Sequence, residues 1–144
     1  MVKTLQLLDQ NELNPSNKII NYIKTQNNMA QKIIQTAGRQ QLGDFAPEFA
    51  HLNDDILFGE VWSRNDLLSL RDRSLVTITS LISQGITDNS LTYHLQEAKK
   101  NGITRSEAAE IITHIAFYAG WPKAWAAFNL AKKVWADDTE TTEK

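Results

Sequence analysis

Helix start and stop signals are the strongest constraint in this 144-residue sequence, because they divide residues 69–135 into four helical lengths. Each start is a side chain that can accept the free N–H groups of a first helical turn, or a proline, which has no N–H to satisfy there. Each stop is a glycine, which readily adopts the left-handed conformation that ends a helix. The starts are Ser69, Asp88, Thr104 and Pro122, and the stops are Gly85, Gly102 and Gly120.

Apolar residues between these signals recur at intervals of three and four, which is the period of one helix face. Leu75, Ile78 and Ile82 form one such stripe. No segment has a convincing strand alternation, so the sequence predicts an all-α helical bundle. The expected apolar positions are Leu75, Ile78, Leu81, Ile82, Leu91, Leu95, Ala98, Ala108, Ile111, Ile112, Ile115, Ala119, Trp125, Phe128, Leu130, Ala131 and Trp135.

The sequence before residue 69 is less regular. Pro15 predicts a helix entry, and apolar residues then follow a helical period to Gly38, as one long helix or two short ones. Residues 38–52 are expected to form a loop, and Asn53 is expected to cap a short helix. The predicted divisions are a helical N-terminal extension (1–40), a main domain (41–136) and a flexible acidic tail (137–144).

Composition excludes several classes of function. The chain has no cysteine, which rules out disulfides, cysteine–zinc sites and thiol nucleophiles. Its formal net charge of −2 gives no support to a nucleic-acid or anionic-membrane partner. No targeting signal and no apolar run of membrane-spanning length is visible, so we expect a soluble cytoplasmic protein.

Titratable side chains on apolar helix faces are the best candidates for chemistry, because burial shifts a pKa and demands a partner. His94 lies on the core side of its helix, where it either transfers protons or is a core histidine bonded to a carbonyl. Arg71 precedes an apolar stripe and needs a carboxylate from Glu60 or a substrate, unless it simply reaches solvent. Glu60 and Arg64 have the spacing of a helix pair, worth only about 0.2–0.5 kcal/mol when exposed.

Other polar and aromatic residues carry weaker signals. His51 falls in the expected loop, and His114 favours a solvated or interface position. Trp62 is interpreted as a core or interface anchor. The sequence lacks the HExxH, GxSxG and glycine-rich phosphate-loop motifs, and His94 with Glu97 has no second pair of its kind. No metal site is therefore predicted.

Four stretches resemble the signature segments of the carboxymuconolactone decarboxylase family. They are residues 58–64 (FGEVWSR), 70–78 (LRDRSLVTI), 93–104 (YHLQEAKKNGIT) and 116–122 (AFYAGWP). The resemblance runs from about Phe45 to Trp135 and leaves the first 40 or so residues unmatched. It implies an all-α fold whose helical hairpins assemble into an obligate homotrimer or homohexamer, with sites near the subunit contacts.

The family belongs to the alkylhydroperoxidase D-like superfamily, whose peroxidases use a CxxC motif followed four residues later by a histidine. Counting back from His94 places Thr87 and Ser90 at the two cysteine positions. Hydroxyl groups cannot form a disulfide or reduce a peroxide, so this chain resembles the thiol-free branch and is not expected to be a peroxidase.

The resemblance to that branch implies that this chain is a carboxy-lyase. Such an enzyme needs no cofactor and no metal and acts on a small carboxylated lactone. The implied catalytic residues are His94, which transfers the proton, Glu60 and Arg71; the implied substrate-binding residues are Arg64, Trp62 and Tyr118. Arg64 and Arg71 would bind carboxylates, and Glu60 would orient one of these groups or lie against the departing carboxylate. Two alternatives stay open: a non-catalytic oligomeric binding or scaffold protein, and a lyase or isomerase acting on another small carboxylate.

Overall fold

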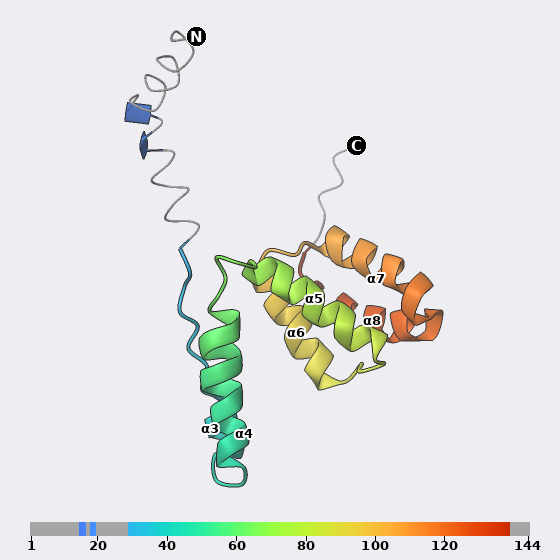
Figure 1. Ribbon diagram of the computed structural model, residues 1–144. Helices are drawn as coiled ribbons and strands as arrows, with labels where there is room; N and C mark the ends of the chain where they lie inside the picture. Colours follow the sequence, from blue (N-terminus) through green and yellow to red (C-terminus); the bar gives the residue numbers. More distant parts are fainter. Residues whose placement is uncertain (1–14, 17, 20–28, 139–144) are drawn as a thin grey trace, which may run out of the picture. The chain divides into compact units, whose positions relative to one another are not determined.

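A computed structural model describes residues 15, 16, 18, 19 and 29–138 of the chain (Figure 1). Every regular element within these residues is helical, which confirms the predicted all-α class. The chain divides into two compact units, Met1–Leu67 and Leu68–Lys144. Within the described residues, no helix is long and apolar enough to cross a membrane.

The second unit contains the helices α5 (Leu70–Ser83), α6 (Asn89–Lys100), α7 (Arg105–Ala119) and α8 (Trp121–Val134). Figure 1 shows α5 and α6, in green to yellow, lying side by side, and α7 continuing into α8. α5 packs against the other three helices, and α8 packs against both α6 and α7. The two hairpins thus form one small bundle around a shared core.

The predicted helix boundaries of this unit are confirmed. The Ser69 hydroxyl accepts the N–H of Asp72 at 3.0 Å, and the Asp88 carboxylate accepts the N–H of Ser90 at 2.9 Å. Thr104 forms a reciprocal capping box with the residue three positions later. The expected stops at Gly85, Gly102 and Gly120 have positive φ angles of 77°, 98° and 112°.

The core of the bundle follows most of the predicted stripes. Its buried apolar residues are Ile78, Ile82, Leu91, Leu95, Ala98, Ile103, Ala108, Ile112, Ala116, Ala124, Ala127, Ala131 and Trp135. The expectation that Trp125 lies on the buried stripe of the last helix is wrong, since 62% of Trp125 is exposed. The buried face of α8 is instead formed by the small residues Ala124, Ala127 and Ala131, which let the helix approach its neighbours closely.

Two sets of hydrogen bonds fasten the ends of these helices. Asn101, after α6, donates to the Ser74 hydroxyl at 2.9 Å, so the end of α6 lies beside the start of α5. The indole of Trp135 donates to the Ile103 carbonyl at 3.3 Å in the buried core. Lys99 pairs with Asp138, in the segment expected to be a flexible tail, at 2.9 Å. The C-terminal end of α8 is therefore held to the rest of the bundle.

The first unit contains α3 (Ala37–Leu42), α4 (Pro47–His51) and η1 (Leu52–Trp62), a π-helix. The loop expected over residues 38–52 is therefore wrong. Gly43 has helical angles at the end of α3, and Pro47 occupies the first turn of α4, where its missing N–H costs nothing. The expected start of a helix at Asn53 is also wrong, because η1 continues directly from α4, and the Asn53 amide donates to the Asp54 carboxylate instead.

Residues 29–36 are not helical, so the part of the predicted N-terminal helix that ran through them is wrong. Residues 15, 16, 18 and 19 are helical, and residues 20–28 lie outside the described residues. The backbone of 29–36 is bonded to distant side chains. Asn65 accepts the N–H of Gln31 at 2.8 Å and donates to its carbonyl at 2.7 Å, while Ser63 accepts the N–H of Ile33 at 2.8 Å. These tertiary bonds replace those of a helix.

Candidate functional site

His94 lies in the middle of α6, between the buried Leu91 and Leu95, and is itself half-buried. Burial lowers the pKa of His94, and the negative charge of Glu97 opposes this effect. The ring of Tyr93 meets the imidazole edge-on, with centroids 5.0 Å apart. Among the described residues the His94 ring has no hydrogen-bond partner, which differs from a core histidine bonded to a carbonyl. The histidine is thus mostly neutral near pH 7, and its ring nitrogens remain available.

Arg71, in the first turn of α5, forms an ion pair with Glu107 on α7. Both side chains of the pair are about two-fifths exposed, at 41% for Arg71 and 42% for Glu107. The predicted need of Arg71 for a carboxylate is therefore met within the second unit.

Arg71 and His94 belong to the same hairpin, on α5 and α6. No hydrogen bond or ion pair joins them in the part of the chain that the structure describes. The start of α5 lies level with Asn101. With a rise of 1.5 Å per residue, His94 lies about 10 Å along α6 from that level. A ligand held by Arg71 would therefore have to extend along the hairpin to reach the imidazole.

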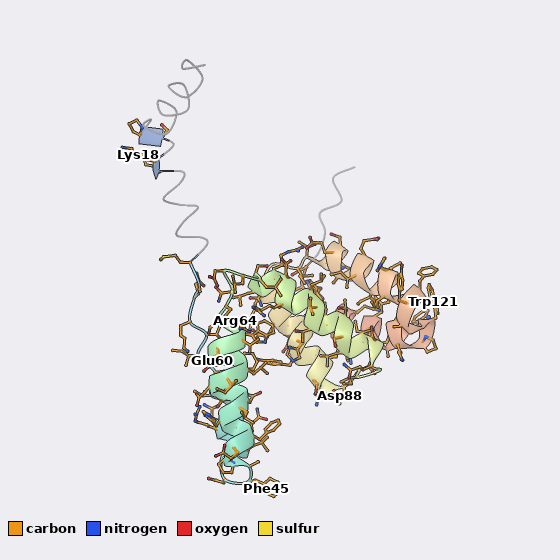
Figure 2. All side chains as sticks on the ribbon, viewed as in Figure 1. Lys18, Phe45, Glu60, Arg64, Asp88 and Trp121 are labelled. Atoms are coloured by element: carbon orange, nitrogen blue, oxygen red, sulfur yellow. The ribbon has the colours of Figure 1, made fainter. Side chains whose placement is uncertain are left out.

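Glu60, Trp62 and Arg64 lie in the first unit, at and just after the end of η1, and Figure 2 labels Glu60 and Arg64 there. Glu60 and Arg64 are exposed, and no ion pair joins them despite their i, i+4 spacing. Trp62 is partly buried and stacks on Phe58, with ring centroids 5.7 Å apart. This contact joins two residues of η1 that are one helical turn apart.

Tyr118 belongs to an exposed aromatic surface at the junction of α7 and α8. This surface consists of Phe117, Tyr118, Trp121 and Trp125, which are 79%, 78%, 55% and 62% exposed. Phe117 and Trp121 meet edge-to-face with centroids 5.8 Å apart, and Tyr118 contacts His114 at 5.0 Å. Trp121 is labelled at this end of the bundle in Figure 2. Four large exposed aromatic residues together are typical of an interaction surface.

The first unit also holds a cluster of charged residues that was not predicted from the sequence. The buried Asp54 accepts the backbone N–H groups of Gly38 and Arg39, both at 2.9 Å. Hydrogen bonds from Arg39 and His51 lower the pKa of Asp55 to about 2, and the His51 Nδ1 lies 2.7 Å from its carboxylate. The i, i+4 spacing of His51 and Asp55 was the only local signal. These contacts fasten α3 to α4 and η1.

Two further predictions concern the superfamily positions and metals. Thr87 and Ser90, which the resemblance places at the positions of the peroxidase cysteines, lie before and in the first turn of α6. Among residues 29–138 and the four described residues before them, no group of three or more His, Asp and Glu side chains is placed to hold a metal ion.

Comparison with known proteins gives a match over most of the helical region. The sequence model of the Carboxymuconolactone decarboxylase family matches residues 47–133. A 4-carboxymuconolactone decarboxylase of Acinetobacter baylyi is 40% identical over 98 residues, which cover 68% of this chain and 72% of that protein. An uncharacterized 15.0 kDa protein of Paracoccus denitrificans is 29% identical over 87 residues, covering 60% of this chain and 64% of that protein. All six candidate site residues fall within the matched range.

Proposed function

Because this chain belongs to the carboxymuconolactone decarboxylase family, we propose that it is a carboxy-lyase that removes carbon dioxide from a small carboxylated lactone without a cofactor. The observation that carries the proposal is the state of His94. A half-buried imidazole with a lowered pKa and no hydrogen-bond partner among the described residues can deliver a proton to a reacting carbon.

The proposed reaction breaks the bond between the carboxylate carbon and the lactone. Carbon dioxide leaves, and the electron pair of that bond is delocalised into the unsaturated lactone as an enolate. The imidazolium form of His94, which is the minor form near pH 7 because burial lowers the pKa, then gives its proton to carbon and becomes neutral, and solvent restores the proton. Because burial disfavours the charged ring, His94 is a stronger acid than an exposed histidine and releases this proton more readily.

Arginine is suited to hold the carboxylate groups of such a substrate, because its planar guanidinium binds a carboxylate through two parallel hydrogen bonds. We assign this role to Arg71, which already pairs with the carboxylate of Glu107, and to Arg64. Glu60 is assigned to orient one of the reacting groups or to lie against the departing carboxylate. Trp62 and Tyr118 are assigned to substrate contact.

We further propose that the chain acts as a homotrimer or homohexamer. The aromatic surface of Phe117, Tyr118, Trp121 and Trp125 supports this assembly, since a single chain leaves more than half of each residue exposed. Burial of large aromatic side chains contributes strongly to stable subunit contacts.

A screen of the purified protein tests the proposed function. Small lactones, β-keto acids and vinylogous acids are offered to the protein, and carbon dioxide release is measured. We expect release from a carboxylated muconolactone. We expect His94→Ala to reduce kcat at least tenfold, because the proton donor is lost. We expect Arg71→Ala to reduce kcat/KM at least tenfold, because the substrate loses a carboxylate partner. Full turnover in both variants would overturn the assigned roles.

A second candidate, a non-catalytic scaffold protein of the same fold, is favoured by one observation. The Arg71 guanidinium is already paired with Glu107, as expected of a structural ion pair. The same screen separates the two candidates, because a scaffold releases no carbon dioxide from any of the compounds while still assembling.

A further inference from the structure

We infer that Glu107 is a positioning residue, which holds the Arg71 guanidinium in place to receive the carboxylate of the substrate. This inference rests on the proposed function and concerns a residue outside the six to which that function assigns a role. Two observations support the inference. Each of the two carboxylate oxygens of Glu107 accepts a hydrogen bond, and most of the N–H donors of Arg71 are not used.

Glu107 is fixed by its own helix before it meets Arg71. One carboxylate oxygen, Oε2, accepts the backbone N–H of Thr104 at 2.9 Å, and the Thr104 hydroxyl accepts the N–H of Glu107 at 3.2 Å. This capping box sets the position of the carboxylate relative to α7. Its second oxygen, Oε1, is then presented to Arg71 at a defined place.

Arg71 uses only a small part of its hydrogen-bonding capacity in this contact. A guanidinium has five N–H donors, and a single bond from Nη2 to Glu107 is the only one that Arg71 makes to a described residue. With 41% of the Arg71 side chain exposed, other donors can reach a ligand. An incoming carboxylate can therefore bind Arg71 while Glu107 keeps its own bond.

A fixed partner of this kind lowers the cost of binding. A free arginine side chain loses rotamer freedom when it binds a ligand, whereas one already held by Glu107 has lost much of that freedom on folding. The opposite possibility is that Glu107 competes with the substrate for Arg71. The two predict opposite changes in affinity when the charge of Glu107 is removed.

The variant Glu107→Gln distinguishes positioning of Arg71 by Glu107 from competition between Glu107 and the substrate. Glutamine also serves in a capping box, so α7 keeps its N-terminal bonds. Its single oxygen is then used by Thr104, and the amide group offers Arg71 no acceptor. The readouts are KM and kcat for the carboxylated muconolactone, with Glu110→Gln as the matched control, since it removes the same charge from an exposed position of the same helix.

We expect Glu107→Gln to raise KM about tenfold while kcat stays within about twofold, as for loss of a binding interaction made equally in ground and transition state. Glu110→Gln should change neither. In an Arg71→Ala background, Glu107→Gln should have no further effect on KM, because Glu107 acts through Arg71. An unchanged KM, a lower KM, or an additive effect in the double variant would each overturn the inference.

The failure of this inference is distinguishable from failure of the proposed function. A wild-type protein that releases no carbon dioxide from the muconolactone overturns both. A wild-type protein that turns it over, with Glu107→Gln folded by circular dichroism and unchanged in KM, overturns only the role of Glu107.

Discussion

Asp54 accepts the backbone N–H of Gly38 over 2.9 Å, and its carboxylate occupies the space beside the glycine where any other residue would have a Cβ. A Cβ built on Gly38 would lie 2.7 Å from the nearer carboxylate oxygen and 3.0 Å from the Ala50 carbonyl. The start of α3 is thus held against α4 and η1 by a contact that only glycine permits.

Gly38→Ala is therefore expected to destabilise the first unit by about 2 kcal/mol, because the inserted methyl group forces apart a buried carboxylate and two backbone segments. Urea denaturation measures the change in the free energy of unfolding. Gly59→Ala is the control, since its Cβ would meet nothing closer than 3.3 Å, and it should shift stability by less than about 1 kcal/mol. Equal effects of the two substitutions would show that the contact at Gly38 is not tight.

Trp135→Phe is expected to destabilise the bundle by about 1–3 kcal/mol. The substitution removes the indole donor, leaves the buried Ile103 carbonyl without that partner, and shrinks a fully packed side chain. Trp125→Phe provides a matched control at an exposed position of the preceding helix. Thermal unfolding should separate the variants by several degrees, and coincident unfolding curves would contradict the structural role of Trp135.

The pH dependence of stability should carry a contribution from His94. Burial lowers its pKa in the folded state below the ordinary value of 6.5, so the unfolded chain binds this proton more readily. The free energy of unfolding should therefore fall as pH drops from about 6.5 through the folded-state pKa, and stay level above 6.5 as far as His94 is concerned. His94→Gln should remove that part of the acid-side decline.

The measurement is the difference between the wild-type and His94→Gln stability curves from pH 8 to pH 5, with exposed His114→Gln as control. A difference that stays constant with pH would show that the folded protein does not disfavour the charged His94.

The aromatic surface should control the mass of the protein in solution. Light scattering at micromolar concentration is expected to give three or six times the chain mass of 16.3 kDa. The double variant Trp121→Ser, Phe117→Ser should lower the measured mass toward that of a monomer, because the proposed subunit contact loses two large aromatic groups. The control Val76→Ser, at an exposed apolar position of α5, should leave the measured mass unchanged. A wild-type protein that is monomeric would contradict the proposed assembly.

The four helices of the second unit could be predicted from the sequence because their signals are local. A cap such as Ser69 or Thr104 and a stop such as Gly102 act on residues within one helical turn, and the buried stripes repeat along one face. The first unit could not be predicted in the same way. Its segment 29–36 is held by Ser63 and Asn65, about 30 residues later, and such bonds leave no periodic pattern.

The candidate site was predictable in its residue types but only partly in its contacts. His94 could be placed on a buried face, because Leu91 and Leu95 share its helix. The partner of Arg71 could not be predicted from the sequence. Glu107 lies 36 residues away on α7, and only the packing of α7 on α5 brings it to Arg71. The capping box that Glu107 forms with Thr104 is a local feature, and it does not indicate the partner of the second carboxylate oxygen of Glu107.

Proton transfer by His94, in a decarboxylation that needs no added cofactor, can be tested by replacing its imidazole. Carbon dioxide release from the carboxylated muconolactone is followed for wild type and for His94→Asn, both confirmed as folded and equal in oligomeric mass. We predict turnover by wild type and a loss of about 100-fold or more in kcat for His94→Asn. Equal turnover by the two proteins would contradict proton transfer by His94, and no turnover by wild type would contradict the proposed decarboxylation.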